Sequence, residues 1–429
     1  MDNWKPRFFI VWSGQAVSLV GSGLVQFALV WWLTLTTGSA AVLAGATLAA
    51  ILPEVFLGPF AGALVDRFNR KVVMVVADSS IAAATVILVL LFASGLIQPW
   101  HLYVVLFLRG IGGVFHFPAM QASTSLMVPP EHLARIAGLN QLLRGILNIA
   151  TPPLGALLIS LLPMYGVVAV DVITAMIAVG ILLSVSIPQP QKERAVETLT
   201  PLALLRDVRE GLLYVKARPG LVAILIMATL INFLLNPAGM LLPLLVTHHF
   251  QGGAWHLSLI ESGFGIGIIA GSLILSTWGG FKRKILTSMI GLIGMGSGSL
   301  LVGLAPAEAF SLAVAGFCLF GLMNPITNGP LGAILQTRVE PSIQGRVMTL
   351  VSSSAMAMSP LGMILAAPVS EWLGIQAWFI AGGFVTIAMG IAGLFIPIVM
   401  HIEDDLPLAV PVPAAAPGPD GLAQSLSAE

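Results

Sequence analysis

The feature that most constrains this chain is a series of apolar runs that recurs from one end to the other. Each run is close to the roughly 20 residues that a helix needs to cross about 30 Å of hydrocarbon. Charges, prolines and polar clusters separate twelve predicted spans, at residues 8–35, 40–65, 72–95, 100–125, 135–162, 165–187, 220–247, 256–280, 285–305, 309–335, 344–368 and 375–399. Only 9% of the residues are charged, against about 25% in an ordinary soluble domain. We therefore predict an all-α integral membrane protein with twelve transmembrane helices, embedded in a lipid bilayer.

The basic residues test this number of spans, because cytoplasmic loops of membrane proteins collect lysine and arginine. With the N-terminus inside, every lysine and arginine outside the spans falls on the inner side of the membrane. The two remaining basic residues, Arg109 and Arg144, lie inside spans. We expect a multi-pass protein of the cell membrane with both termini in the cytoplasm.

The chain divides into two related halves, as in transporters that are built from repeats. Residues 1–187 form a predicted N-terminal six-helix bundle and residues 219–400 a C-terminal one. A cytoplasmic linker with a surface helix is expected at 188–218, and a disordered Pro/Ala-rich tail at 401–429. Three residues after the fourth span recur after the tenth at constant spacing: Val128, Pro130 and Arg135 match Val339, Pro341 and Arg346.

The loop after the second span carries the most specific motif. It reads Gly62-Ala63-Leu64-Val65-Asp66-Arg67-Phe68-Asn69-Arg70-Lys71, and it resembles the G-x-x-x-D-R-x-x-R-[RK] signature of the major facilitator superfamily. Within that superfamily, three further segments are similar to the drug and siderophore exporters, a group that includes macrolide-efflux and enterobactin-export proteins. These segments are Pro118-Ala119-Met120-Gln121, Val128-Pro129-Pro130 with Arg135, and Gln344-Gly345-Arg346-Val347. The resemblance covers about residues 5–400.

The resemblance implies two six-helix bundles around a central cavity that opens alternately to each side, most often driven by a proton gradient. It places Asp66 near the start of the eleventh span, close to Arg346. Gly62 permits a tight helix approach, and Arg67 or Arg70 can pair across the bundle interface, so the loop is a candidate gate. The alternative is plain positive-inside topology, which needs Arg and Lys but neither Gly62 nor Asp66.

Two departures from the family pattern concern direction and symmetry. The antiporter signature G-P-x-x-G-G is half present, as Thr151-Pro152-Pro153-Leu154-Gly155-Ala156, and this weakens the case for export. The second-half copy of the loop lacks its aspartate, so any gate is asymmetric.

Ionisable residues inside spans are functional candidates, because burying their charge in lipid costs about 2.5–3.5 kcal/mol on insertion scales. Glu54 is expected near the midplane, as a proton carrier or substrate contact, with a permanent salt bridge as the alternative. Arg109 and Arg144 are candidate counter-ions of Glu54 or contacts for an anionic substrate. Asp78, Asp171 and Glu261 are expected nearer the membrane faces, where side chains can snorkel, and of these we retain Glu261 on the proton or substrate path.

Several uncharged polar residues are candidates for the cavity lining. Asn148 shares one helix face with Asn140 and Arg144, at i, i+4 and i+8 spacing. The other candidates are Gln15, Ser22, Gln26, Asn232, Asn236 and Asn328. The alternative is interhelical hydrogen bonding for the residues of the first half, and helix packing for Asn232, Asn236 and Asn328.

Other classes of function have little support in the sequence. A formal net charge of zero disfavours nucleic-acid binding, and there is no G-x-x-x-x-G-K-[ST], H-E-x-x-H or G-x-S-x-G motif. Gly265-Ile266-Gly267-Ile268-Ile269-Ala270 matches a dinucleotide fingerprint, but it lies in an apolar helix and is interpreted as a packing face. His248, His249 and His256 cluster without carboxylate or cysteine partners, so we expect no metal and no cofactor.

The hypothesis is a non-enzymatic, monomeric secondary transporter that exports amphipathic small molecules in exchange for protons. A proton-coupled uptake symporter is the nearest alternative. A non-transporting sensor or scaffold is the alternative from another class, and it would tolerate neutralisation of Asp66 and Glu54.

Overall fold

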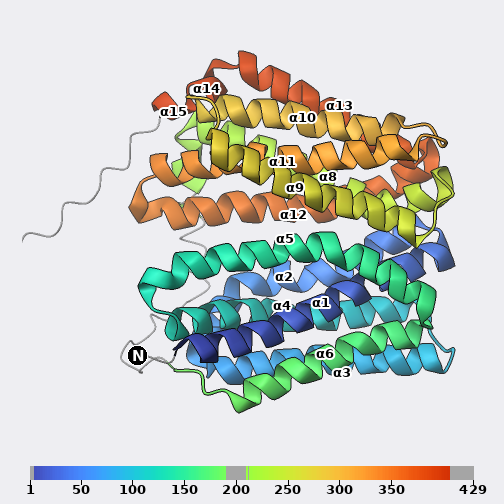
Figure 1. Ribbon diagram of the computed structural model, residues 1–429. Coiled ribbons are helices and arrows are strands. Elements are labelled where there is room, and N and C mark those ends of the chain that lie inside the picture. The colour runs from blue at the N-terminus through green and yellow to red at the C-terminus, as the bar shows by residue number, and fades with distance from the viewer. Residues whose placement is uncertain (1–3, 190–208, 211, 406–429) are drawn as a thin grey trace, which may run out of the picture.

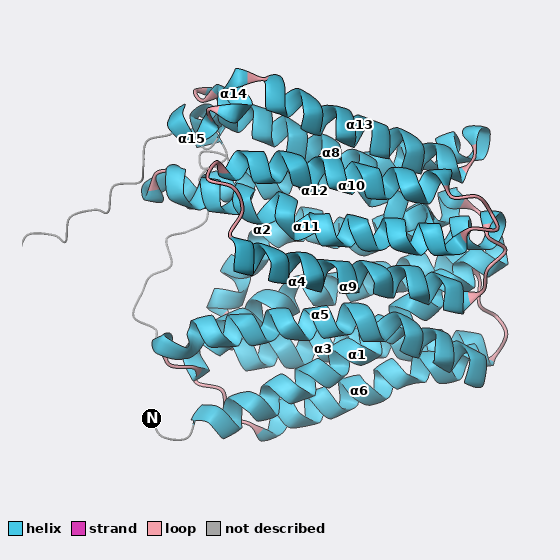
Figure 2. Cartoon of the chain, turned by 45° about the horizontal axis from the view of Figure 1, so that its top comes forward, coloured by secondary structure: helices cyan, strands magenta, loops and turns pink. Residues whose placement is uncertain are grey.

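The computed structural model describes residues 4–189, 209–210 and 212–405, and every element in them is a helix (Figures 1 and 2). The first half contains α1 (Trp4–Thr37), α2 (Ala40–Arg67), α3 (Arg70–Ala93), α4 (Pro99–Met127), α5 (Pro130–Leu161) and α6 (Met164–Ser184). The second half contains α8 (Pro219–Leu244), the π-helical turn η1 (Leu245–His249), α9 (Ala254–Trp278), α10 (Lys284–Leu304), α11 (Phe310–Arg338), α12 (Pro341–Leu373), α13 (Ile375–Phe395), α14 (Pro397–Met400) and α15 (Ile402–Asp405).

Twelve helices among the described residues are long and apolar enough to cross a membrane. The predicted all-α fold with twelve spans is confirmed. The predicted fifth and eleventh spans, which begin at residues 135 and 344, start later than the helices do. Both helices instead begin at a proline, Pro130 and Pro341, where the missing N–H would have no partner within the helix.

The helices form two bundles, α1–α6 and α8–α13, which lie one above the other in Figure 1. They contact each other mainly through α5 against α9 and α2 against α12. The start of α1 and the short helix α15 lie at the same end of the molecule, on the left in Figure 1. We call this the termini end, and the opposite end the distal end.

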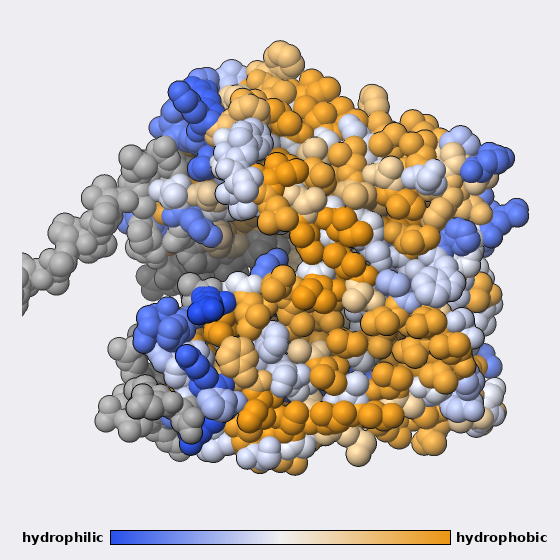
Figure 3. All heavy atoms as spheres, viewed as in Figure 1, coloured by the Kyte–Doolittle hydropathy of each residue, from blue (hydrophilic) through white to orange (hydrophobic). Residues whose placement is uncertain are grey.

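The apolar core shows where the two bundles are joined. One cluster of buried residues at the distal end runs through both halves and includes Leu43, Leu241 and Ala366. At the termini end each half has a separate cluster, around Phe8 in the first half and Ile285 in the second. Figure 3 shows the surface hollowed between the halves at the termini end. The molecule is therefore closed distally and open toward the termini end.

Glycines bring α9 and α11 close together. A Cβ atom on Gly267 would collide with the carbonyl oxygen of Cys318, and one on Gly271 with that of Leu322. The glycine-rich run at 265–270 is thus a helix-packing face, as its apolar setting indicated.

The linker and the tail lie mostly outside the described residues. Of the predicted surface helix in the linker, residues 209, 210 and 212–216 are described and helical. The expected disorder from residue 401 onward is wrong for α15. Ile402 is fully buried, and the Glu403 carboxylate accepts the Ile285 N–H at 2.8 Å at the start of α10.

Candidate functional site

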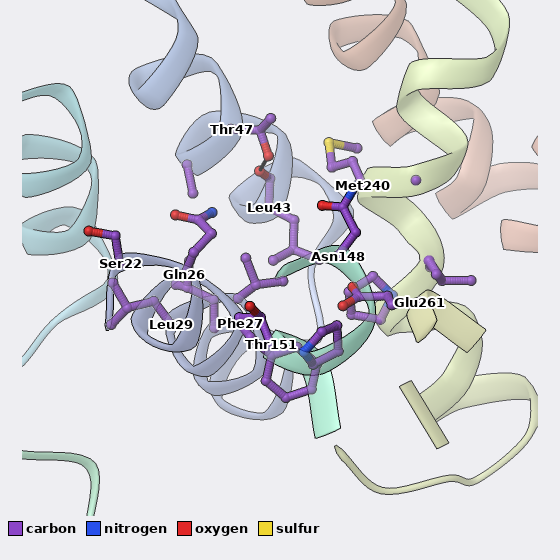
Figure 4. A pocket seen from close by; sticks show the side chains of 18 of the residues that line it. Ser22, Gln26, Phe27, Leu29, Leu43, Thr47, Asn148, Thr151, Met240 and Glu261 are labelled. Carbon is purple, nitrogen blue, oxygen red and sulfur yellow. Dashed lines mark hydrogen bonds between the residues drawn. The ribbon is translucent and has the colours of Figure 1, made fainter. Parts of the chain in front are cut away.

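A central cavity of about 730 Å³ lies between the two bundles, with walls from α1, α2, α4, α5, α8, α9 and α11. Most of the wall is apolar, with leucines from both halves and Phe27, Phe264 and Phe317. Figure 4 shows the close view of this cavity. Its main polar and charged side chains are Ser22, Gln26, Thr47, Arg109, Asn148, Thr151 and Glu261. The cavity offers a large apolar surface with a few polar contacts.

Glu261 is the acidic group of this cavity. It lies eight residues into α9, and Figure 4 shows it beside the cavity together with Asn148 of α5. The two helices pack closely here, since Ser262 donates to the Ile149 carbonyl at 2.9 Å. Within the described residues the Glu261 carboxylate makes no hydrogen bond or ion pair. The carboxyl group is therefore available to bind a ligand.

Two further cavities adjoin the central one. A cavity of about 540 Å³ in the first bundle shares Leu19 and Leu147 with it, and extends to Gln15, His116 and Arg144. A cavity of about 310 Å³ in the second bundle shares Phe264 and Phe317. The shared walls make the three spaces neighbours along the bundle interface.

Each of the six candidates for the cavity lining lies on the wall of one of the three cavities. Ser22 and Gln26 line the central cavity, Gln15 the second, and Asn232, Asn236 and Asn328 the third. Some also make interhelical hydrogen bonds. Asn236 donates to Ser359 of α12 at 3.1 Å, while Asn328 bonds only within α11 to Asn324.

Of the two roles considered for Arg109, the pairing with Glu54 does not occur. Arg109 forms an ion pair with Asp171 of α6, and that carboxylate is fully buried. Ser22 donates to the same carboxylate at 2.8 Å and Thr85 at 3.0 Å. Side chains of α1, α3 and α4 thus all contact the buried Asp171 carboxylate of α6.

The expectation that Asp78 and Asp171 snorkel to a membrane face is also wrong. Both are buried, with 5% and 0% of their surface exposed. Distance from a helix end was the basis for that expectation, but which face a residue occupies decides its burial. Sequence reasoning missed these two residues and His116 as parts of polar networks, although an aspartate within each apolar run was a usable signal.

Arg144 and Glu54 take separate positions. Arg144 lines the second cavity, and its guanidinium carbon lies 5.3 Å from the centre of the Phe117 ring, within the range of a cation–π contact. Glu54 is exposed and lies seven residues, or two turns, beyond Thr47 on α2. It therefore shares the face by which α2 lines the central cavity, nearer the termini end.

The gate motif is described only in part. The side chains of Gly62, Asp66 and Arg346 are outside the described set, so their pairing stays a prediction. Arg67 ends α2. Arg70 donates from Nη1 to the Ala122 carbonyl of α4 at 3.1 Å. The backbone N–H of Arg70 donates to the side-chain Oε1 of Gln189 at 3.1 Å. These contacts dock the loop on its own bundle.

The described residues contain no group of three His, Cys, Asp or Glu side chains that could hold a metal ion. His249 instead bonds to the Ala305 carbonyl at 2.8 Å, and His256 accepts the Gly253 N–H at 3.1 Å.

Comparison with known proteins decides the family. A family model described as "Transmembrane secretion effector" matches residues 4–415. The chain belongs to the transmembrane secretion effector family. This transmembrane secretion effector is 36% identical to macrolide efflux protein A of Streptococcus pyogenes over 390 residues, 91% of this chain and 96% of the relative. It is 26% identical to the multidrug efflux pump Tap of Mycobacterium tuberculosis over 417 residues, 94% of this chain and 96% of that protein.

Solved structures agree on the fold of the transmembrane secretion effector. The nucleoside transporter NupG matches with a TM-score of 0.67 at 14% identity, covering 91% of this chain and 98% of that one. A POT family transporter in complex with 5-aminolevulinic acid matches with a TM-score of 0.69 at 12% identity, covering 90% and 95%. The protein is a multi-pass membrane transporter of the efflux type for small molecules, in the major facilitator superfamily, and it is not an enzyme.

Proposed function

We propose that this transmembrane secretion effector exports macrolide-like amphipathic cations from the cytoplasm in exchange for protons. The observation that carries the proposal is the central cavity, whose apolar walls surround an unpaired Glu261 carboxylate. Its volume lies in the upper part of the range of about 300–1,000 Å³ for drug-sized ligand sites. Apolar walls would bury the ring of such a compound, and the carboxylate would attract its protonated amine. The relative named macrolide efflux protein A supports this substrate class.

The basic residues of the loops support the orientation. By the positive-inside rule they favour a cell-membrane protein with both termini in the cytoplasm, and the open termini end would then face the cytoplasm. In this arrangement substrate enters past Glu54 and Arg144, and it binds at Glu261, Asn148 and Gln26. Pairing of Asp66 with Arg346, assisted by Gly62, Arg67 and Arg70, would close this end in the opposite state. We propose that the monomer is the transporting unit.

Everted membrane vesicles, which expose the cytoplasmic face, test the proposal. Vesicles with an acidic interior should accumulate radiolabelled erythromycin, and a protonophore should abolish the accumulation. Glu261→Gln should raise KM about tenfold, equivalent to about 1.4 kcal/mol of lost charge attraction. Glu308→Gln is the matched control, because this carboxylate is exposed in the distal loop before α11.

No accumulation by demonstrably folded protein with any macrolide would contradict the substrate class. Accumulation that persists with the protonophore would contradict proton exchange. A Glu261→Gln variant with the KM of the wild type would remove Glu261 from the site.

A further inference from the structure

Two buried polar layers cross the first bundle, two helical turns apart. Each of three helices contributes one residue to each layer at a spacing of seven residues: Gln15 and Ser22 in α1, Asp78 and Thr85 in α3, and His116 and Arg109 in α4. Seven residues span about 10 Å along a helix. The alternating helix directions place Gln15, Asp78 and His116 nearer the termini end. We call these three residues the inner layer, and the other three with Asp171 the outer layer.

The outer layer has a fixed charge. The Asp171 carboxylate is paired with Arg109 and accepts from Ser22 and Thr85. Arginine is not deprotonated in proteins, so in this layer its positive charge offsets the Asp171 carboxylate. The ion pair positions the helices that contact it.

The inner layer has a histidine where the outer layer has an arginine. Asp78 Oδ2 accepts from Gln15 Nε2 at 3.0 Å, and Asp78 Oδ1 lies 3.2 Å from His116 Nε2. That nitrogen is buried and makes no aligned hydrogen bond within the described structure. Two bare lone pairs would repel at this distance, so at least one of the two groups carries a proton.

The inner layer can therefore exist in two charge states. A neutral imidazole beside ionised Asp78 leaves a net charge of −1, and one further proton, which converts the imidazole to imidazolium, makes the pair neutral. Histidine is the side chain that changes charge near neutral pH. Closing the site away from water favours the neutral state, because an unpaired buried charge is costly.

The inner layer also has access to water. Gln15 and His116 line the second cavity. Of the charged groups on the surrounding helices, Arg144 of α5 lines the same cavity, while Arg109 of α4 and Asp171 of α6 are occupied with each other. The pair therefore borders a cavity that also holds the positive charge of Arg144.

We propose that Asp78 and His116 form the proton-binding site that couples export to the pH gradient. The imidazole takes up one proton from water on the outer side when the distal end is open and the termini end is closed, and it returns the proton to cavity water when the termini end opens. No other bond changes. This proposal rests on the proposed function, and it makes Glu54 a substrate contact and not the proton carrier.

Proteoliposome transport separates coupling from folding. His116→Arg converts the inner layer into a fixed pair like that of the outer layer. It should lower accumulation of radiolabelled erythromycin driven by a pH gradient at least about tenfold, while exchange of labelled for unlabelled compound without a gradient stays within about twofold of wild type. Asp78→Asn should behave in the same way, and Asp78→Glu should retain coupling. His248→Gln, at an exposed position of the distal end, is the control. Wild-type accumulation in His116→Arg would overturn the proposal, as would an equal loss of accumulation and exchange.

Titration of His116 tests the site without any substrate. In the full chain labelled with ¹⁵N-histidine, we identify the His116 resonance by its loss in His116→Gln. This resonance should shift with pH as the imidazole gains a proton, and Asp78→Asn should change that pH response by removing the carboxylate. A resonance that does not titrate, or that ignores Asp78→Asn, would overturn the proposal. If wild-type protein exchanges no macrolide, the proposed function fails while this titration still decides the proton site.

Discussion

At the scale of single residues, the first bundle is distinguished by buried carboxylates that are joined to other helices. The sequence predicted that Arg109 matters, because a charge inside a span is costly. It could not supply the partner, since Asp171 is 62 positions away and reaches Arg109 only through packing of α4 near α6. The polar faces of α1 and α5 were predictable, because local spacing determines which residues share a helix face.

Asp171→Asn should destabilise the protein strongly, because it leaves the Arg109 guanidinium buried without its counter-charge. Removing one partner of a buried pair costs about 3–5 kcal/mol. Thermal unfolding in detergent should show a large fall in Tm.

Asp404→Asn is the matched control. Asp404 lies 3.6 Å from Arg283 with both side chains about half exposed, and exposed ion pairs contribute little to stability. Equal shifts in Tm for the two variants would contradict the structural role of the outer layer.

At the scale of elements, helix number and order could be predicted, because crossing lipid demands long apolar helices with satisfied backbone groups. Helix ends were less accurate, since α5 and α12 begin at Pro130 and Pro341, before the first residues of the predicted spans. The sequence predicted only part of the close packing between helices. The small-residue run in α9 indicated a packing face, but the partner helix α11 came from the structure.

Gly271→Ala should weaken the contact between α9 and α11. The added Cβ would meet the Leu322 carbonyl oxygen, which belongs to the backbone and cannot move aside cheaply. We expect a lower Tm and a smaller monodisperse fraction by size-exclusion chromatography.

Gly180→Ala in α6 is the control, because a Cβ there meets nothing within 4 Å. It should be neutral or slightly stabilising, by up to about 1 kcal/mol, since alanine favours helix over glycine. A tolerated Gly271→Ala would show that α11 can shift to make room.

At the scale of the whole molecule, the apolar core that the described side chains form across both bundles lies at the distal end. The two-bundle fold was predictable from the repeat and the family resemblance. Which of the two conformations the structure adopts could not be predicted, because the same sequence adopts both the state open at the termini end and the state open at the distal end. The account therefore requires that the shared distal core can separate while the termini end closes.

Distances between spin labels test this central claim most directly. Labels at Phe68 and Phe281 report on the termini end, and labels at Leu96 and Glu308 on the distal end, all in a Cys318→Ala background that removes the native thiol. The four positions are exposed in loops that connect the spans. We expect a macrolide or acidic pH to populate a second state, in which the distance at the termini end shortens and the distance at the distal end lengthens. Two distances that stay unchanged under all conditions, or that shift in the same direction, would contradict alternating access in this protein.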